Sequence, residues 1–215
     1  MKEILGSKMI DVYKSQFKEF GDSPASLGCP KGRQHLRFKA LTKNVTNGSL
    51  LDFGCGFGDL SVYLEQSKID VEYHGCDVMQ EFLSIAKKNR PNNNFYLTQI
   101  GESLKDNYDF IVASGTFNFL YSKDKKEHIS FVYKTIESLF NCCNHSLSVD
   151  FLSSIVDYAA PDVYHQDIAG LIDFISSKLS RRFQIDHSYM PYEFCIHIFK
   201  EQEVLRPDHV FKISS

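Results

Sequence analysis

The chain has 215 residues, of which 43% are hydrophobic and 24% are charged, and its formal net charge is -3. This composition is ordinary for a soluble globular domain that is long enough to bury a core. The absence of a basic excess argues against a protein that binds nucleic acid tightly. No apolar run reaches membrane-spanning length, so no membrane partner is expected.

The six cysteines form no Cys-x-x-Cys pair and no cysteine and histidine cluster with zinc spacing. They are expected to be free thiols in a reducing compartment. The segment Met1-Lys2-Glu3-Ile4-Leu5-Gly6 lacks the apolar core of a signal peptide. We therefore expect a cytoplasmic protein.

Hydrophobic periodicity predicts two helices before the first strand, at residues 2–20 and 33–43, separated by a loop rich in glycine and proline. Strands and helices then alternate. Strands are expected at residues 49–53, 71–76, 95–98, 109–113, 146–152, 183–188 and 193–199. Helices are expected at residues 58–67, 79–89, 124–141 and 166–178.

This alternation predicts an α/β fold in which a doubly wound, mostly parallel seven-stranded sheet is covered by helices on both faces. The last two strands have no helix between them, so they are expected to pair as an antiparallel hairpin. We expect one globular domain, in which residues 1–32 form an N-terminal helical cap on a domain spanning residues 33–215. Ligands of such sheets bind at the carboxyl ends of the strands.

The first strand runs into the spacing Asp52-x-Gly54-x-Gly56-x-Gly58. Glycines without a Cβ allow a sharp bend and let a ligand touch the backbone. The dinucleotide fingerprint Gly-x-Gly-x-x-Gly is spaced differently, and a carboxylate here would repel a pyrophosphate and attract a cation. The loop resembles motif I of the class I S-adenosylmethionine (SAM)-dependent methyltransferases. The alternative is a tight turn between strand and helix with Asp52 as a cap.

The resemblance covers residues 33–200 and implies a SAM site. Backbone around Gly54, Cys55 and Gly56 would lie against the methionine part of the cofactor, and Asp52 would hold its amino group. Arg37 precedes the first strand and would pair with the methionine carboxylate through its bidentate geometry. A solvated helix face is the alternative for Arg37.

The ends of the later strands supply the remaining cofactor candidates. Asp77 ends the second strand, where a carboxylate can accept from both ribose hydroxyls, although it could also be a helix N-cap. By resemblance, Val78 and Met79 would flank the adenine. Further along the chain, Gly101 and Glu102 would meet the adenine edge, unless they form a surface turn. The segment Ser114-Gly115-Thr116 would lie beside the transferable methyl group.

The acceptor would lie under residues 1–32 or the loop at 153–165. His165 is the candidate general base because its ordinary pKa is near neutrality, and Tyr158 and Tyr164 are candidates for positioning the acceptor. The alternatives are a cap or surface histidine and tyrosines that cover the core. Asp150 is either a site residue or a satisfied polar group. No metal set is evident, because nothing fixes the geometry of Asp150, Asp157 and Asp162.

These observations predict a SAM-dependent methyltransferase that acts on a small polar metabolite, such as a sugar or sugar nucleotide, as a monomer or homodimer. One alternative is an RNA or protein methyltransferase on the same fold. Others are a non-catalytic SAM-binding protein and an NAD-dependent oxidoreductase, against which the Asp52 carboxylate argues.

Overall fold

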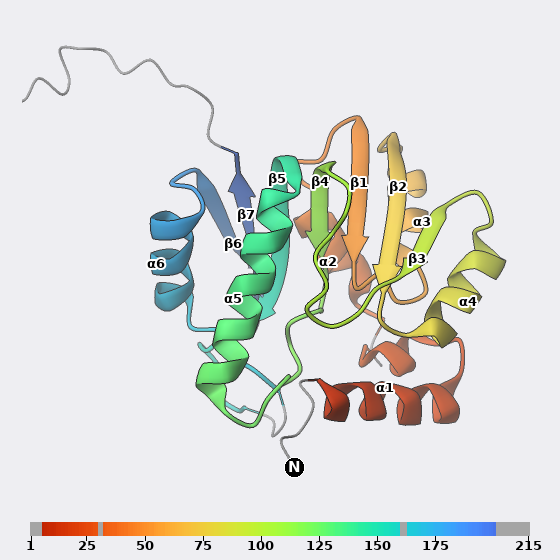
Figure 1. Cartoon of the computed structure of the whole chain (residues 1–215), viewed down its shortest axis with the longest axis horizontal. Helices are drawn as coiled ribbons and strands as arrows, with labels where there is room; N and C mark the ends of the chain where they lie inside the picture. The colour runs from red at the N-terminus through yellow and green to blue at the C-terminus, as the bar shows by residue number, and fades with distance from the viewer. Residues whose placement is uncertain (1–5, 30–31, 160–162, 201–215) are drawn as a thin grey trace, which may run out of the picture.

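The computed structural model describes residues 6–29, 32–159 and 163–200 (Figure 1). Within these ranges the chain forms one seven-stranded sheet in the order β3-β2-β1-β4-β5-β7-β6. Part of the predicted first helix, residues 2–5, and the metal candidate Asp162 lie outside the described residues.

The strands lie close to their predicted positions. They are β1 (Gly48–Phe53), β2 (Val71–Asp77), β3 (Asn94–Leu97), β4 (Tyr108–Ala113), β5 (Cys143–Leu152), β6 (Phe183–Met190) and β7 (Glu193–Phe199). Strand β5 begins at Cys143 rather than at residue 146, because a register shift in β4 lets Tyr108 pair with Cys143.

The helices also follow the predicted pattern. They are α1 (Ser7–Phe20), α2 (Gln34–Leu41), α3 (Asp59–Gln66), α4 (Gln80–Asn89), α5 (Lys125–Asn141) and α6 (Ile168–Lys178). A short 3-10 helix, η1 (Pro24–Leu27), lies inside the predicted loop and is capped by the Ser23 side chain. None of the helices in the described ranges combines the length and the apolar character needed to cross a membrane.

The sheet has the predicted topology. Strands β1 to β5 pair in parallel, whereas β7 pairs antiparallel to both β5 and β6. The predicted fold class is therefore confirmed, including its antiparallel last strand. Because β7 runs against β5, the pair Leu152 and Glu193 brings the start of β7 to the edge where the parallel strands end.

Alternating side chains on the central strands build two cores, one on each face of the sheet. Leu51 and Ile111 pack on the face covered by α5 and α6, whereas Leu50 and Phe110 pack on the face covered by α2, α3 and α4. Parallel strands buried on both faces read as nearly continuous apolar runs, which explains why the central strands could be predicted.

Helix α1 lies across the carboxyl ends of the strands (Figure 1). Its start is anchored where the Gly6 N–H donates to the Tyr121 carbonyl at 2.9 Å. Its apolar face packs on α4, with the rings of Tyr13 and Phe17 at 5.9 and 5.7 Å from the ring of Phe82. Helices α1 and η1 together form a roof over the edge at which ligands of such sheets bind.

We expect Phe151→Ala to lower the free energy of unfolding by about 3–5 kcal/mol, because it opens a cavity in the core. Phe151 is buried in β5, and its ring lies 6.0 Å from that of Phe117 and 5.7 Å from that of Phe194. Urea denaturation measures the change. The control Phe20→Ala, at a side chain that is 46% exposed, should cost about 0.5 kcal/mol or less. Equal losses in the two variants would contradict this assignment of the core.

Candidate functional site

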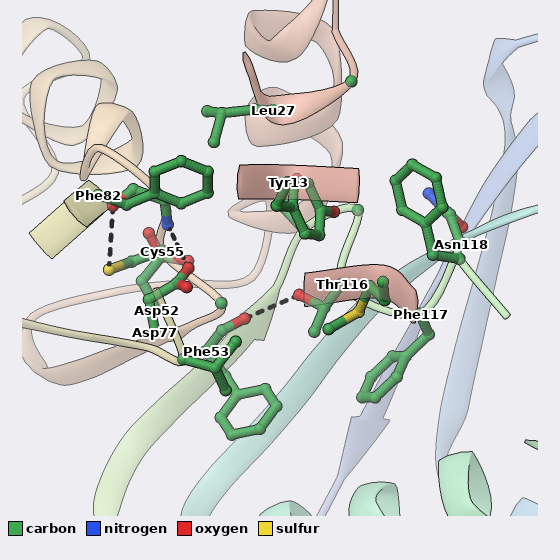
Figure 2. A pocket seen from close by; sticks show the side chains of 18 of the residues that line it. Tyr13, Leu27, Asp52, Phe53, Cys55, Asp77, Phe82, Thr116, Phe117 and Asn118 are labelled. Carbon is green, nitrogen blue, oxygen red and sulfur yellow. Dashed lines mark hydrogen bonds between the residues drawn. The ribbon is translucent and has the colours of Figure 1, made fainter. Parts of the chain in front are cut away.

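A cavity of about 400 Å³ lies between the carboxyl ends of the strands and the roof formed by α1 and η1 (Figure 2). This volume is in the range of small-molecule sites. Residues that follow β1, β2, β3 and β4 line its floor, and Tyr13 and Leu27 line it from the roof.

The glycine loop exposes backbone to this cavity. Gly54 and Gly56 have φ angles of 78° and 55°, which residues with a Cβ rarely adopt. A Cβ on Gly54 would lie 2.6 Å from the Thr116 hydroxyl oxygen, and one on Gly56 would lie 2.9 Å from the Leu27 side chain. The loop is held down where Gly54 and Cys55 donate to the Cys76 carbonyl at 2.8 and 2.9 Å. Larger residues at Gly54 and Gly56 would close the space where a ligand can touch the loop.

Asp52 presents a buried carboxylate to the cavity. It is 3% exposed, and its Oδ2 accepts a hydrogen bond from the Tyr73 hydroxyl at 2.7 Å. Among the described residues, no group donates a hydrogen bond to its Oδ1. Burial raises the pKa of Asp52 to about 7, the nearby carboxylates of Asp77 and Asp59 add to the rise, and the Tyr73 hydrogen bond opposes it. A cation in the cavity would relieve this cost.

Asp77 is tied to the backbone on both sides. Its Oδ2 accepts from the Gly56 N–H at 2.9 Å, and its Oδ1 accepts from the Met79 N–H at 2.8 Å. Burial raises the pKa of Asp77, and these backbone N–H groups oppose the rise. Helix α4 has Met79 as its N-cap residue, so Asp77 steadies the turn before the helix. Each carboxylate oxygen keeps a second lone pair that can accept from a ligand hydroxyl.

The structure brings twelve of the thirteen predicted cofactor residues to this one cavity. They are Arg37, Asp52, Gly54, Cys55, Gly56, Asp77, Val78, Gly101, Glu102, Ser114, Gly115 and Thr116. Met79 is the exception. It is 2% exposed and packs with Phe57 and Phe82.

Arg37 lies in a buried ion cluster, not on a solvated helix face. Its Nε and Nη2 donate to the two Glu193 carboxylate oxygens at 2.6 and 2.5 Å. Its Nη1 donates to the Cys29 sulfur at 3.2 Å, and its Nε lies 4.0 Å from Asp150 Oδ2. Three of the five guanidinium N–H groups are thereby used, which leaves two for a ligand.

Asp150 organises the loop that follows β4. Its carboxylate accepts from the Gly115 N–H at 2.6 Å and from the Ser114 hydroxyl at 3.2 Å. Burial raises its pKa to about 6, and the charge of Arg37 opposes the rise. This residue is a satisfied polar group that fixes part of the cavity floor.

The structure does not bring the three predicted acceptor-side residues to the cavity. Tyr158 is 76% exposed, and Tyr164 packs on His128 with ring centroids 4.3 Å apart. His165 contacts the Ser153 carbonyl through Nδ1 at 2.9 Å. From the loop at 153–165, Val163 does line the cavity. Isolated bridges join Val163 to Phe119 and Ser153 to Gln166.

Sequence reasoning missed other residues that line the cavity, notably Tyr13 and Glu193. Glu193 is the first residue of the antiparallel strand β7. A strand that runs against its parallel neighbour begins at the edge where that neighbour ends, so the predicted hairpin indicated that a strand could begin at the carboxyl edge of the sheet. Tyr13 belongs to the predicted apolar face of its helix, but nothing local shows what that face covers.

In the described part of the chain, no group of three or more histidine, cysteine, aspartate or glutamate side chains could hold a metal ion.

Comparisons with known proteins agree on a single family. A family model described as a methyltransferase domain matches residues 51–138. A Mycobacterium tuberculosis protein named as a candidate methyltransferase, Rv1506c, is 29% identical over 157 residues, which cover 71% of this chain and 93% of that protein.

Solved structures share the fold. Magnesium protoporphyrin IX methyltransferase from Synechocystis PCC 6803, solved with bound S-adenosylhomocysteine (SAH), superposes with a TM-score of 0.61 at 14% identity, covering 91% of this chain and 96% of that one. The DhpI–SAH complex superposes with a TM-score of 0.65 at 11% identity, covering 92% and 97%.

We expect Asp52→Asn to raise the free energy of unfolding of the ligand-free protein at about pH 8 by about 1–4 kcal/mol. The carboxyl has an ordinary pKa of 3.8 and a pKa of about 7 in the fold. Between these values the native protein binds the proton more tightly than the unfolded chain, so this group lowers stability as pH rises through that window. Asparagine keeps an acceptor oxygen for Tyr73.

Urea denaturation at about pH 4.5 and pH 8 measures the effect, which should fall to about a quarter at the lower pH. The exposed Asp70 supplies the control, and Asp70→Asn should show no such pH-dependent gain. An Asp52→Asn variant no more stable than the parent at the higher pH would contradict the burial cost.

Proposed function

We propose, for a chain that belongs to the class I SAM-dependent methyltransferases, that the cavity under α1 binds SAM and delivers its methyl group to a small-molecule acceptor. The observation that carries this proposal is the Asp52 carboxylate, which is buried, faces the cavity and has one oxygen without a donor among the described residues. It lies next to a glycine loop that leaves backbone open to a ligand.

The residues present fit the chemical groups of this cofactor. The amino group of SAM is a cation that Asp52 can hold, and the two remaining guanidinium N–H groups of Arg37 can receive the methionine carboxylate. The bound sulfonium supplies a methyl carbon that is activated for displacement by a nucleophile.

The nucleoside would lie toward β2 and β3. Asp77 can accept from the ribose hydroxyls, and Val78 offers an apolar surface to the adenine. Glu102 is already bent toward the backbone, because its Oε2 accepts from the Gln99 N–H at 2.9 Å. Its carboxylate is therefore held in place at the predicted adenine edge.

Methyl transfer from a sulfonium is an in-line displacement, so this chain's task is to align the acceptor and exclude water. The roof of α1 and η1 supports that role, since the ring of Tyr13 packs edge-on against those of Phe82 and Phe119 at 5.9 and 5.3 Å. The loop after β4 is held by Asp150 and by the bond from the Thr116 hydroxyl to the Phe53 carbonyl at 2.9 Å. Both devices limit the motion of the walls around the methyl group.

The acceptor is proposed to be a small molecule because the cavity is a pocket of about 400 Å³ that the roof partly covers. The finer prediction of a sugar or sugar nucleotide stays a prediction. The magnesium protoporphyrin IX methyltransferase named above shares this fold, which illustrates that the fold alone does not choose the acceptor.

Isothermal titration calorimetry with SAM and SAH tests the proposal. We expect both to bind, and we expect Asp77→Asn to weaken binding by about 10–100-fold, because an amide NH₂ replaces an oxygen that accepts hydrogen bonds. Asp70→Asn, at an exposed position, should leave the affinity unchanged. No binding of either compound below millimolar concentration would overturn the proposed function.

A further inference from the structure

One part of the cavity lies beside Arg37 and away from Asp52 and Asp77, between the loop after β4, the end of β5, the start of β7 and the roof. We call it the acceptor lobe, and its walls include Gln34, Asn118, Phe119, Leu152 and Glu193. Figure 2 shows Asn118 on the opposite side of Thr116 from Asp52 and Asp77. In the proposed function, on which the assignment of this lobe rests, SAM occupies the side of Asp52 and Asp77.

Negatively charged side chains predominate among the residues that line the cavity. Among the described residues that line it, the carboxylates are Asp52, Asp59, Asp77, Glu102 and Glu193, whereas Arg37 is the sole cationic side chain. The charge of Asp59 is balanced by Arg90, whose Nη2 donates to Asp59 Oδ1 at 2.9 Å.

The positive charge of Arg37 is already compensated by neighbouring carboxylates. Glu193 holds it through two hydrogen bonds, and Asp150 lies 4.0 Å from its Nε. The methionine carboxylate of SAM would use its remaining N–H groups. An anionic acceptor would therefore lie near one guanidinium and two carboxylates, those of Glu193 and Asp150, and this is costly.

The polar groups of the lobe suit a hydroxyl or an amine. The Asn118 Oδ1 accepts from the Leu152 N–H at 3.0 Å, which turns Nδ2 away from that strand as a donor. No described residue accepts a hydrogen bond from this Nδ2. Each Glu193 oxygen keeps a lone pair beyond its bond to Arg37. A neutral hydroxyl or amine can donate to Glu193 and accept from Asn118, and an ammonium can donate to Glu193.

The rest of the lobe is apolar. The side chains of Phe119 and Leu152 line it, and the ring of Phe119 meets that of Tyr13 edge-on with centroids 5.3 Å apart. These walls favour an acceptor with an apolar body.

We propose that the acceptor lobe takes a neutral or cationic compound with an apolar body and a hydroxyl or amino group, that it rejects phosphorylated and carboxylated compounds, and that Glu193 sets this preference. A sugar nucleotide carries a diphosphate, so it falls in the rejected class.

Calorimetry on protein saturated with SAH tests this with three probes of similar shape. They are tyramine as the cation, para-propylphenol as the neutral compound and para-hydroxyphenylpropionate as the anion. The first two should bind with dissociation constants at least about tenfold below that of the anion. An anion that binds equally well or better, or the failure of all three to bind, would overturn the proposal.

Two variants test the role of charge. Glu193→Gln removes the carboxylate that compensates the positive charge of Arg37. Gln34→Lys adds a cation at a partly exposed position, so the core need not repack. Each should strengthen binding of the anionic probe by about tenfold or more, whereas Glu65→Gln, on the exposed face of α3, should change nothing. If Gln34→Lys strengthens binding of the anion and Glu193→Gln does not, or if neither variant does, Glu193 does not set the preference.

The titration with SAH separates the two proposals. If SAH does not bind the unmodified protein, the proposed function fails and the acceptor preference fails with it. If SAH binds and the order of the probes is reversed, only the acceptor class is wrong.

Discussion

A buried carboxylate without a cation is the constraint around which this site is arranged. Asp52 lies near the end of a central strand and is 3% exposed, and burial raises its pKa to about 7. The hydrogen bond from Tyr73 offsets only part of that cost, and Asp77 beside it adds to the repulsion. A structure that keeps such a group in a cavity is poised to gain binding energy from a positively charged ligand.

The topology of the sheet places the remaining groups around this carboxylate. Parallel strands β1 to β4 end at one edge, so the glycine loop, Asp77 and the Ser114–Thr116 segment meet there without any motif joining them. The antiparallel β7 adds Glu193 at the same edge, opposite Leu152. Glu193 then fixes Arg37, which links the helix before the first strand to the last strand of the sheet. One edge thus carries both the cofactor groups and the lobe assigned to the acceptor.

The strands, the helices and the residues that line the proposed cofactor side of the cavity could be predicted because their signals are local. The glycine spacing after Asp52 and the carboxylate that ends the second strand each mark a strand end, and strand ends converge in a parallel sheet. The acceptor side could not be predicted, because its residues come from segments distant in sequence. His165 has the chemistry of a general base, but its ring turns to the Ser153 carbonyl. Met79 follows Asp77 and Val78 in sequence, but the backbone turn before α4 buries it beside Phe82.

Proton release on cofactor binding is the sharpest test of a cation site at Asp52. At about pH 6.5 an α-amino group is already charged, whereas most of Asp52, with a pKa of about 7, is protonated in the free protein. Calorimetric titration of SAM in two buffers of different ionisation enthalpy counts the protons released. We expect release of roughly half a proton or more, and its loss in Asp52→Asn. Tight binding with no proton released from the unmodified protein would contradict a cation site at this carboxylate.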